Sequence, residues 1–160
     1  MIIQLLAHFI LGVSIMSSPL SSPSGIKGWR GIVPLHSTRA DVERMLGSGI
    51  NECKCGYYLK DVNVFFEYSS GNCKTGGSGG WDVQADTVLK IVVHQLPAPL
   101  FSDLEIDKTK FEKRYEGHVE RIVSYVNDQE GLVIQVDEVS CLVMGFYYVP
   151  AAADKDFRCP

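Results

Sequence analysis

The chain has 160 residues, a formal net charge of -4 at pH 7, and 46% hydrophobic against 21% charged residues. This ordinary globular composition predicts a chain with a hydrophobic core of its own. The weakly acidic balance argues against a nucleic-acid-binding protein, so we expect no nucleic acid among its partners.

Residues 1–24 are expected to be a signal peptide and spacer. The apolar stretch from Ile2 to Met16 is shorter than the roughly 20 residues that a membrane span needs. It matches the apolar core of a secretory signal, although no Lys or Arg precedes Lys27. An uncleaved anchor and a buried core helix are the alternatives. We expect export to the periplasm or the medium, no stable membrane span after processing, and one domain over residues 25–160.

Residues 37–46 have the pattern of a short helix. Thr38 and Asp41 form a start that resembles a capping box, with Asp in place of the usual Glu. An apolar stripe begins at Val42, and Gly47 is placed to end the helix. A helix this short has to be held by packing against the rest of the fold.

Alternating apolar and polar residues predict six strands, at 56–59, 62–68, 87–94, 118–126, 131–136 and 139–149. Residues 107–115 predict a second short helix, with Asp107 as its N-cap. Two short helices can cover the one apolar face of such a sheet. The expected fold class is therefore α+β, a two-layer sandwich with a largely antiparallel sheet of about six strands covered by one or two short helices.

Five cysteines follow the spacer, and in an exported chain they are expected to be partly oxidised. Cys53 and Cys55 lie at a strand start, where their side chains point the same way. We expect at least one bridge from either of them to Cys73 or Cys159. Cys141, inside a long apolar stretch, is expected to be a buried free thiol. A Cys-x-Cys spacing with no nearby histidine pair does not fit zinc, so no metal site is expected.

The Gly-rich run at 76–80 satisfies Gly-x-Ser-x-Gly, but no helical pattern follows Ser78 as a nucleophile elbow requires. Outside the signal region, no histidine is paired with Cys or Glu at ligand spacing. We therefore expect no cofactor and no catalytic residues. The alternative is an enzyme of unrecognised type, with a site near His94, His118 and the Gly-rich run.

The last predicted strand is apolar on both faces, whereas a strand of a one-sided sheet alternates. Its second face is expected to carry Leu142, Met144, Phe146 and Tyr148. Either the segment 29–35 or the loop with Trp81 covers this face, or the face meets a partner. The residues expected to bind a protein partner are Trp81, Leu142, Met144, Phe146 and Tyr148.

The stretch Ser37–Gly47 resembles the helix followed by Leu-Gly in small outer-membrane-assembly lipoproteins of the SmpA/OmlA type. Proteins related to these in fold include a secreted β-lactamase inhibitor built from two α/β units. Trp29–Leu35, Phe66–Tyr68, Gly80–Trp81 and Arg158–Cys159 are similar to stretches of uncharacterised exported bacterial proteins. The chain departs from the lipoprotein pattern because it has no cysteine near its start for lipidation. The resemblance implies an exported, non-enzymatic module that binds protein or is associated with the cell envelope.

Overall fold

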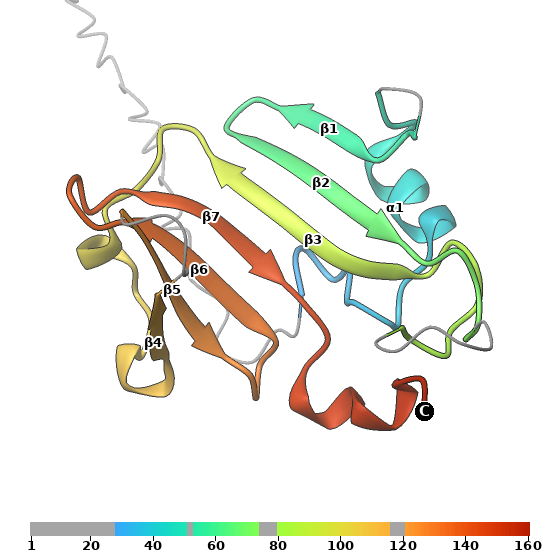
Figure 1. Cartoon of the computed structure of the whole chain (residues 1–160). Coiled ribbons are helices and arrows are strands. Elements are labelled where there is room, and N and C mark those ends of the chain that lie inside the picture. The colour runs from blue at the N-terminus through green and yellow to red at the C-terminus, as the bar shows by residue number, and fades with distance from the viewer. Residues whose placement is uncertain (1–27, 51–52, 74–79, 116–120) are drawn as a thin grey trace, which may run out of the picture.

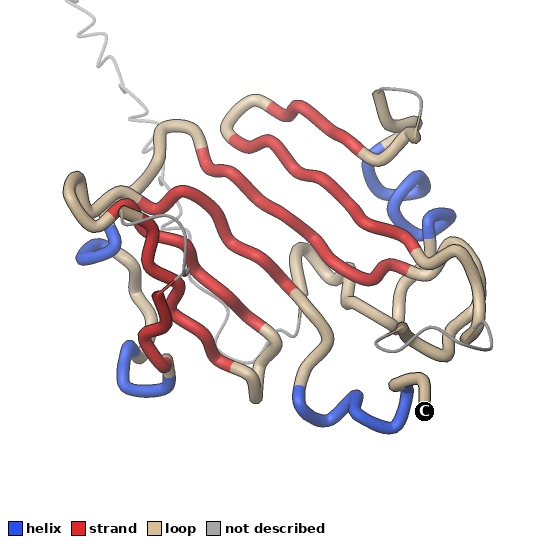
Figure 2. The backbone as a smooth tube through the Cα atoms, in the orientation of Figure 1, coloured by secondary structure: helices blue, strands red, loops and turns tan. Residues whose placement is uncertain are grey.

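The computed structural model describes residues 28–50, 53–73, 80–115 and 121–160. The predicted signal peptide and spacer, residues 1–24, lie outside the described residues. The described α-helix is α1 (Arg39–Leu46). The strands are β1 (Gly56–Leu59), β2 (Val62–Tyr68), β3 (Val88–Gln95), β4 (Glu112–Tyr115), β5 (Ile122–Asn127), β6 (Leu132–Asp137) and β7 (Val143–Tyr148). Three short 3-10 helices, drawn with α1 in Figure 2, are Phe101–Asp103, Lys108–Lys110 and Ala152–Phe157.

The seven strands form one antiparallel sheet in the order β1-β2-β3-β7-β6-β5-β4. Strands β1 to β3 and strands β4 to β7 each run up and down, and the pairing of β3 with β7 joins the two meanders (Figure 1). The predicted α+β sandwich is confirmed, with seven strands in place of about six. The hairpin of β1 and β2 has the predicted bounds, with Leu59 opposite Val62.

One face of the sheet carries the hydrophobic core. Alternate residues of the central strands point into it, and Val64, Ile91 and Ile134 are fully buried there. Above the first meander lie α1, through Val42, and the segment around Trp29, whose ring meets that of Phe66 at 6.3 Å between centroids. The segment 29–35 therefore covers the core face of the sheet.

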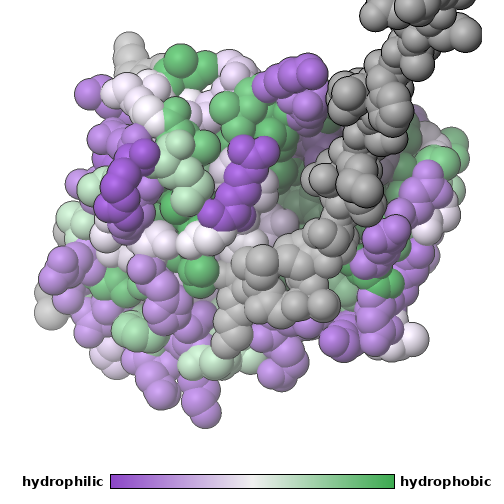
Figure 3. Space-filling model, turned by 180° about the vertical axis from the view of Figure 1, so that it is seen from behind, coloured by the Kyte–Doolittle hydropathy of each residue, from purple (hydrophilic) through white to green (hydrophobic). Residues whose placement is uncertain are grey.

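The far end of the core is covered by the segment that links β3 to β4. Phe101 stacks on Tyr125 of β5 with 4.1 Å between ring centroids. Leu104, Ile106 and Phe111 also pack against the core from this segment. Figure 3, seen from behind, shows hydrophilic side chains between scattered apolar ones on this side of the molecule, as expected for the outside of a covering layer.

The predicted capping box of α1 is present. The Thr38 hydroxyl accepts a hydrogen bond from the Asp41 backbone N–H, and the Asp41 carboxylate accepts one from the Thr38 backbone N–H at 2.8 Å. Val42 is fully buried, whereas Met45 is 48% exposed, so the buried stripe of the helix is narrow. Gly47 ends the helix with a positive φ of 81°.

We expect Thr38→Ala to lower the free energy of unfolding by about 1 kcal/mol. The Asp41 backbone N–H loses its acceptor, and the Asp41 carboxylate loses the hydrogen bond from the Thr38 hydroxyl that helps to hold it in the capping box. Urea unfolding measures the change. Ser48→Ala, at an exposed position just beyond the helix, is the matched control and should leave stability nearly unchanged. An equal effect of the two substitutions would contradict the role of the cap.

The same capping box predicts a dependence on pH. Hydrogen bonds from Thr38 and Arg44 lower the pKa of Asp41 from 3.8 to about 2. Because the folded-state pKa is the lower one, the stabilisation by Asp41 is complete above pH 4 to 5 and is lost as pH falls towards 2. Urea unfolding between pH 5 and pH 2 should show a smaller loss for Asp41→Asn than for the wild type. Parallel curves would contradict this assignment.

The second predicted helix, over residues 107–115, is not formed. Asp107 does act as an N-cap, accepting from the Thr109 backbone N–H at 3.1 Å, but the turn that it caps ends at Lys110. Residues Glu112–Tyr115 then form β4, which pairs with β5 along its whole length. Pairing with a neighbouring strand thus overrides the local helical pattern, as it does for many short segments.

Candidate functional site

Strand β7 is bulged where it pairs with β6. Val136 lies opposite Val143, whereas Gln135 lies opposite Gly145, so the register shifts and Met144 is an extra residue. A bulge places two residues of one strand against one of its partner and interrupts the alternation of side chains. An even-numbered residue after Met144 in β7 therefore faces the same side of the sheet as an odd-numbered residue before it.

The predicted second face of Leu142, Met144, Phe146 and Tyr148 is corrected by this bulge. Phe146 is only 9% exposed and belongs to the core, together with Val143. Tyr148 packs against the core, and its burial raises the pKa of its phenol. Met144 is 47% exposed, and Leu142 precedes β7 in a half-buried position. These four residues do not form one surface.

The face of the sheet opposite the core nevertheless carries a row of apolar side chains across four strands. Phe65 of β2 lies opposite Val92 of β3, Val92 lies opposite Tyr147 of β7, and Tyr147 lies opposite Val133 of β6. Directly opposed residues of antiparallel strands project to the same side, with Cβ atoms about 5 Å apart. All four side chains are partly exposed. We name this set, Phe65, Val92, Tyr147 and Val133, the outer-face row.

Aromatic side chains extend the outer-face row. The ring of Tyr58, which is 62% exposed, meets Phe65 edge-on at 5.9 Å, and the ring of His94 lies 6.2 Å from Phe65. His94 Nδ1 donates a hydrogen bond to the Met144 carbonyl oxygen at 2.6 Å. A Cβ at Gly145 would come within 3.2 Å of the His94 ring, so the glycine makes room for this ring beside the row.

Two charged residues border the row, Glu67 of β2 and Lys90 of β3. They lie opposite each other and form an ion pair, so that their charges cancel. In Figure 1 no described helix or loop passes in front of β2, β3 and β7. The row is therefore a neutral, apolar strip on a sheet face that the described residues leave accessible.

A groove of about 460 Å³ adjoins the row at one end of β2 and β3. Its lining includes Glu67, Trp81, Leu89, Lys90, Val149 and Pro150. Trp81 is half-buried, with the Arg158 guanidinium 4.8 Å from the centre of its ring. Because Glu67 and Lys90 border both the groove and the row, the predicted binding residue Trp81 lies on a surface that continues the row. Simple alternation along β2 and β3 predicts that Phe65 and Val92 lie on this face, whereas the assignment of Tyr147 requires the bulge.

All four candidate disulfide cysteines are bonded, in a pairing that differs from the predicted one. One bridge joins Cys73 to Cys159 across a sequence separation of 86, and the other joins Cys53 to Cys55. The predicted bridge between these two pairs is not formed. The segment of Cys53 and Cys55 precedes β1 and turns at Lys54, which has a φ of 50°, so that the two neighbouring thiols bond to each other.

Cys141 is a free thiol, as predicted, but it is exposed rather than buried. The strand expected over residues 139–149 begins only at Val143, and Cys141 belongs to the turn before it, with a φ of 58°. The Cys141 backbone N–H donates to the Asp137 carbonyl oxygen at 2.8 Å. The Asp137 carboxylate accepts hydrogen bonds from the backbone N–H groups of Val139 and Ser140, and these bonds fix the turn.

The residues proposed for the alternative enzyme are only partly described. His94 lies on the outer face, where it is bonded to a backbone carbonyl, while His118 and residues 76–79 of the Gly-rich run lie outside the described residues. A histidine–carboxylate pair that was not predicted joins His36 Nε2 to Asp154 Oδ1 at 2.9 Å. The other oxygen of Asp154 accepts from the Ala151 backbone N–H. This pair therefore ties the C-terminal 3-10 helix to the segment before α1.

No three His, Cys, Asp or Glu side chains gather in metal-binding geometry within the part of the chain that the structure describes. Across those same residues, no helix has the length and hydrophobicity needed to cross a membrane. Fold and site together define a small disulfide-bonded α+β protein with an apolar outer sheet face. The chain matches no protein-family model, and comparison with curated proteins and with solved structures gave no match.

Proposed function

We propose that the chain is an exported, disulfide-stabilised binding protein that holds a partner protein through the outer-face row. The observation that carries the proposal is the line of four apolar side chains across β2, β3, β7 and β6 on the face away from the core. Aromatic and aliphatic side chains are the groups that protein interfaces bury at their centres. A sheet presents them in fixed positions, which lowers the entropy lost on binding.

The chemistry of the face favours a partner with an apolar, uncharged contact surface. Glu67 and Lys90 neutralise each other, so this part of the face has no net charge to attract anionic lipids or nucleic acid. Tyr58 and His94 add aromatic rings with polar edges, which suit the rim of a protein interface. Trp81 in the adjoining groove extends the same surface towards Cys73.

Export is supported by two features of the chain. The apolar stretch Ile2–Met16 followed by a Ser- and Pro-rich spacer is typical of a secretory signal. Two disulfides involve four of the five cysteines, and such bonds persist in oxidising compartments.

The test compares the mature protein with the double variant Phe65→Thr, Val92→Thr. Threonine has the β-branched shape that a strand favours, and it removes apolar surface from the row. Each purified protein is immobilised and exposed to the envelope fraction of the producing organism. We expect the double variant to retain about tenfold less of the partner than wild type does, or less still. The two proteins should unfold at similar urea concentrations.

Val139→Thr is the matched control, because Val139 is 74% exposed but lies in the turn before β7. It should retain the partner fully. Sedimentation of the purified proteins distinguishes a second copy of the chain from a different partner. Equal retention by the double variant and wild type, or self-association that the double variant abolishes, would overturn the proposal of a separate partner protein.

A further inference from the structure

The Cys53–Cys55 bridge lies at the surface, in the turn that leads into β1. Cys53 is exposed and Cys55 is half-buried, and the ring that they close contains only Lys54 between them. In the chain-entropy model a bridge stabilises a fold in proportion to the logarithm of the loop that it closes. This bridge therefore constrains the unfolded chain far less than Cys73–Cys159, with its separation of 86. The contribution of this bridge to stability is therefore the smaller of the two.

The bridge also holds its turn in a conformation that an open chain avoids. Lys54 has a φ of 50°, in the left-handed region that residues with a Cβ adopt rarely. Its carbonyl oxygen lies so close to Gly49 that a Cβ there would approach it to 2.4 Å. Reduction of the bridge would release Lys54 from this conformation. The backbone conformation of Lys54 thus favours reduction of the bridge.

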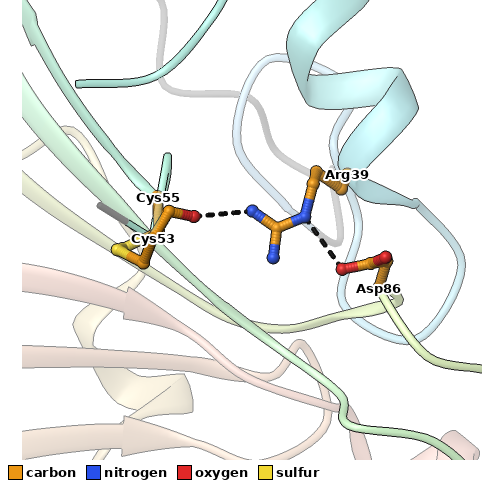
Figure 4. The surroundings of a disulfide bond; sticks show 4 residues. All are labelled: Arg39, Cys53, Cys55 and Asp86. Carbon is orange, nitrogen blue, oxygen red and sulfur yellow. Dashed lines mark hydrogen bonds and ion pairs between the residues drawn. A yellow bond between two sulfur atoms is a disulfide. The ribbon is translucent and has the colours of Figure 1, made fainter. Parts of the chain in front are cut away.

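Arg39 fixes the turn from the side of α1. Its guanidinium donates to the Cys53 carbonyl oxygen at 2.8 Å and to Asp86 Oδ1 at 2.8 Å, as Figure 4 shows. The ring of Tyr68 lies 3.9 Å beneath the guanidinium. These contacts involve the main chain of Cys53 and do not require the disulfide. Arg39 therefore holds the main chain of Cys53 in place whether the bridge is open or closed.

We propose that Cys53 and Cys55 form a thiol–disulfide exchange site that oxidises a dithiol of another protein. A thiolate of that dithiol attacks the exposed Cys53 sulfur, the bond between Cys53 and Cys55 breaks, and Cys55 leaves as a thiolate. The second thiolate of the partner attacks its own sulfur in the mixed disulfide and releases Cys53. The partner gains a disulfide, the two cysteines gain two electrons, and the two protons of the dithiol pass to them. This site shares no residue with the outer-face row, and the proposal does not depend on the proposed binding function.

The first measurement uses the full mature protein with Cys141→Ser, which removes the exposed free thiol. The protein is equilibrated with defined ratios of reduced to oxidised dithiothreitol, alkylated, digested and mapped by mass spectrometry. We expect Cys53–Cys55 to be half reduced at a ratio about 100-fold lower than Cys73–Cys159, which serves as the internal reference. Reduction of both bridges at the same ratio would overturn the proposal.

The second measurement follows one turnover with a reduced peptide that carries two cysteines. The Cys141→Ser protein should convert about one equivalent of peptide dithiol to disulfide, faster than air oxidation alone. The further substitutions Cys53→Ser and Cys55→Ser should abolish this conversion while Cys73–Cys159 stays intact. Conversion at an unchanged rate in this variant would show that the site has no exchange activity.

Discussion

Replacing both Cys73 and Cys159 by serine is expected to lower the free energy of unfolding by about 4 to 5 kcal/mol. The bridge joins residues separated by 86 positions, and in the chain-entropy model a loop of this length removes that much conformational freedom from the unfolded state. It also fastens the C-terminal tail to the loop after β2, beside the pair of Trp81 and Arg158. Urea unfolding without reductant, in a Cys141→Ser background that prevents reshuffling, measures the loss.

The double substitution Cys53→Ser, Cys55→Ser is the matched control for the long bridge. It also removes one disulfide, but from a loop with a separation of 2, and should cost only about 1 to 2 kcal/mol. In the presence of excess reductant, the Cys141→Ser parent and the two variants that each lack one bridge should become similar in stability. Equal losses for the two pairs would mean that loop length does not govern how these bridges stabilise the fold.

Phe66→Ala is expected to lower the free energy of unfolding by about 3 to 5 kcal/mol. Phe66 is 4% exposed and meets three aromatic rings of the core, those of Trp29, Tyr57 and Tyr68. Removal of its ring leaves a cavity that the sheet and the segment above it cannot fill without moving. Urea unfolding of the mature protein at neutral pH measures this loss.

The neighbouring residue provides the control. Phe65 lies on the opposite face of β2 and is partly exposed, so Phe65→Ala should cost about 1 kcal/mol or less. The same contrast is expected between Phe146 of β7 and Val92 of β3: Phe146→Ser should unfold the core, whereas Val92→Thr on the outer face should not. A destabilisation by Phe65→Ala as large as that by Phe66→Ala would contradict the assignment of the two faces.

The helix and the first three strands could be read from local sequence. The capping pair of Thr38 and Asp41, the alternation around Phe66, and the polar turn between β1 and β2 each act over a few neighbouring residues. Tertiary contacts agree with these local preferences. The pattern therefore predicts the bounds of β1 and β2 and the start of α1.

The faces of β7 could not be derived from sequence alone. Which side Phe146 and Tyr147 face depends on the bulge at Met144, and a bulge reflects how one strand fits its partner. An alternation continued through residues 139–149 therefore assigns the wrong residues to the outer face. The prediction placed Phe146 and Tyr148 on the second face, whereas both pack in or against the core and Tyr147 lies on the outer face.

The segment between β3 and β5 shows a second limit of prediction from sequence. Residues 107–115 carry a good N-cap and apolar residues four apart, which satisfy a short helix locally. Their place at the edge of the sheet gives them backbone partners in β5, and these partners decide the conformation. The pairing of Cys53 with Cys55 could not be predicted for a similar reason. It depends on a left-handed backbone conformation at Lys54, which a lysine does not signal as a glycine would.

Site-directed photo-crosslinking tests the binding proposal most directly. A photo-reactive phenylalanine analogue replaces Tyr58, beside the outer-face row, or Tyr115, on the edge strand β4; these side chains are 62% and 67% exposed. The proteins are irradiated in the living producing organism. We predict that Tyr58 yields one discrete crosslinked protein, that Tyr115 does not, and that Phe65→Thr with Val92→Thr removes the product. Identical products from both positions, or none from Tyr58, would contradict a partner held on this face.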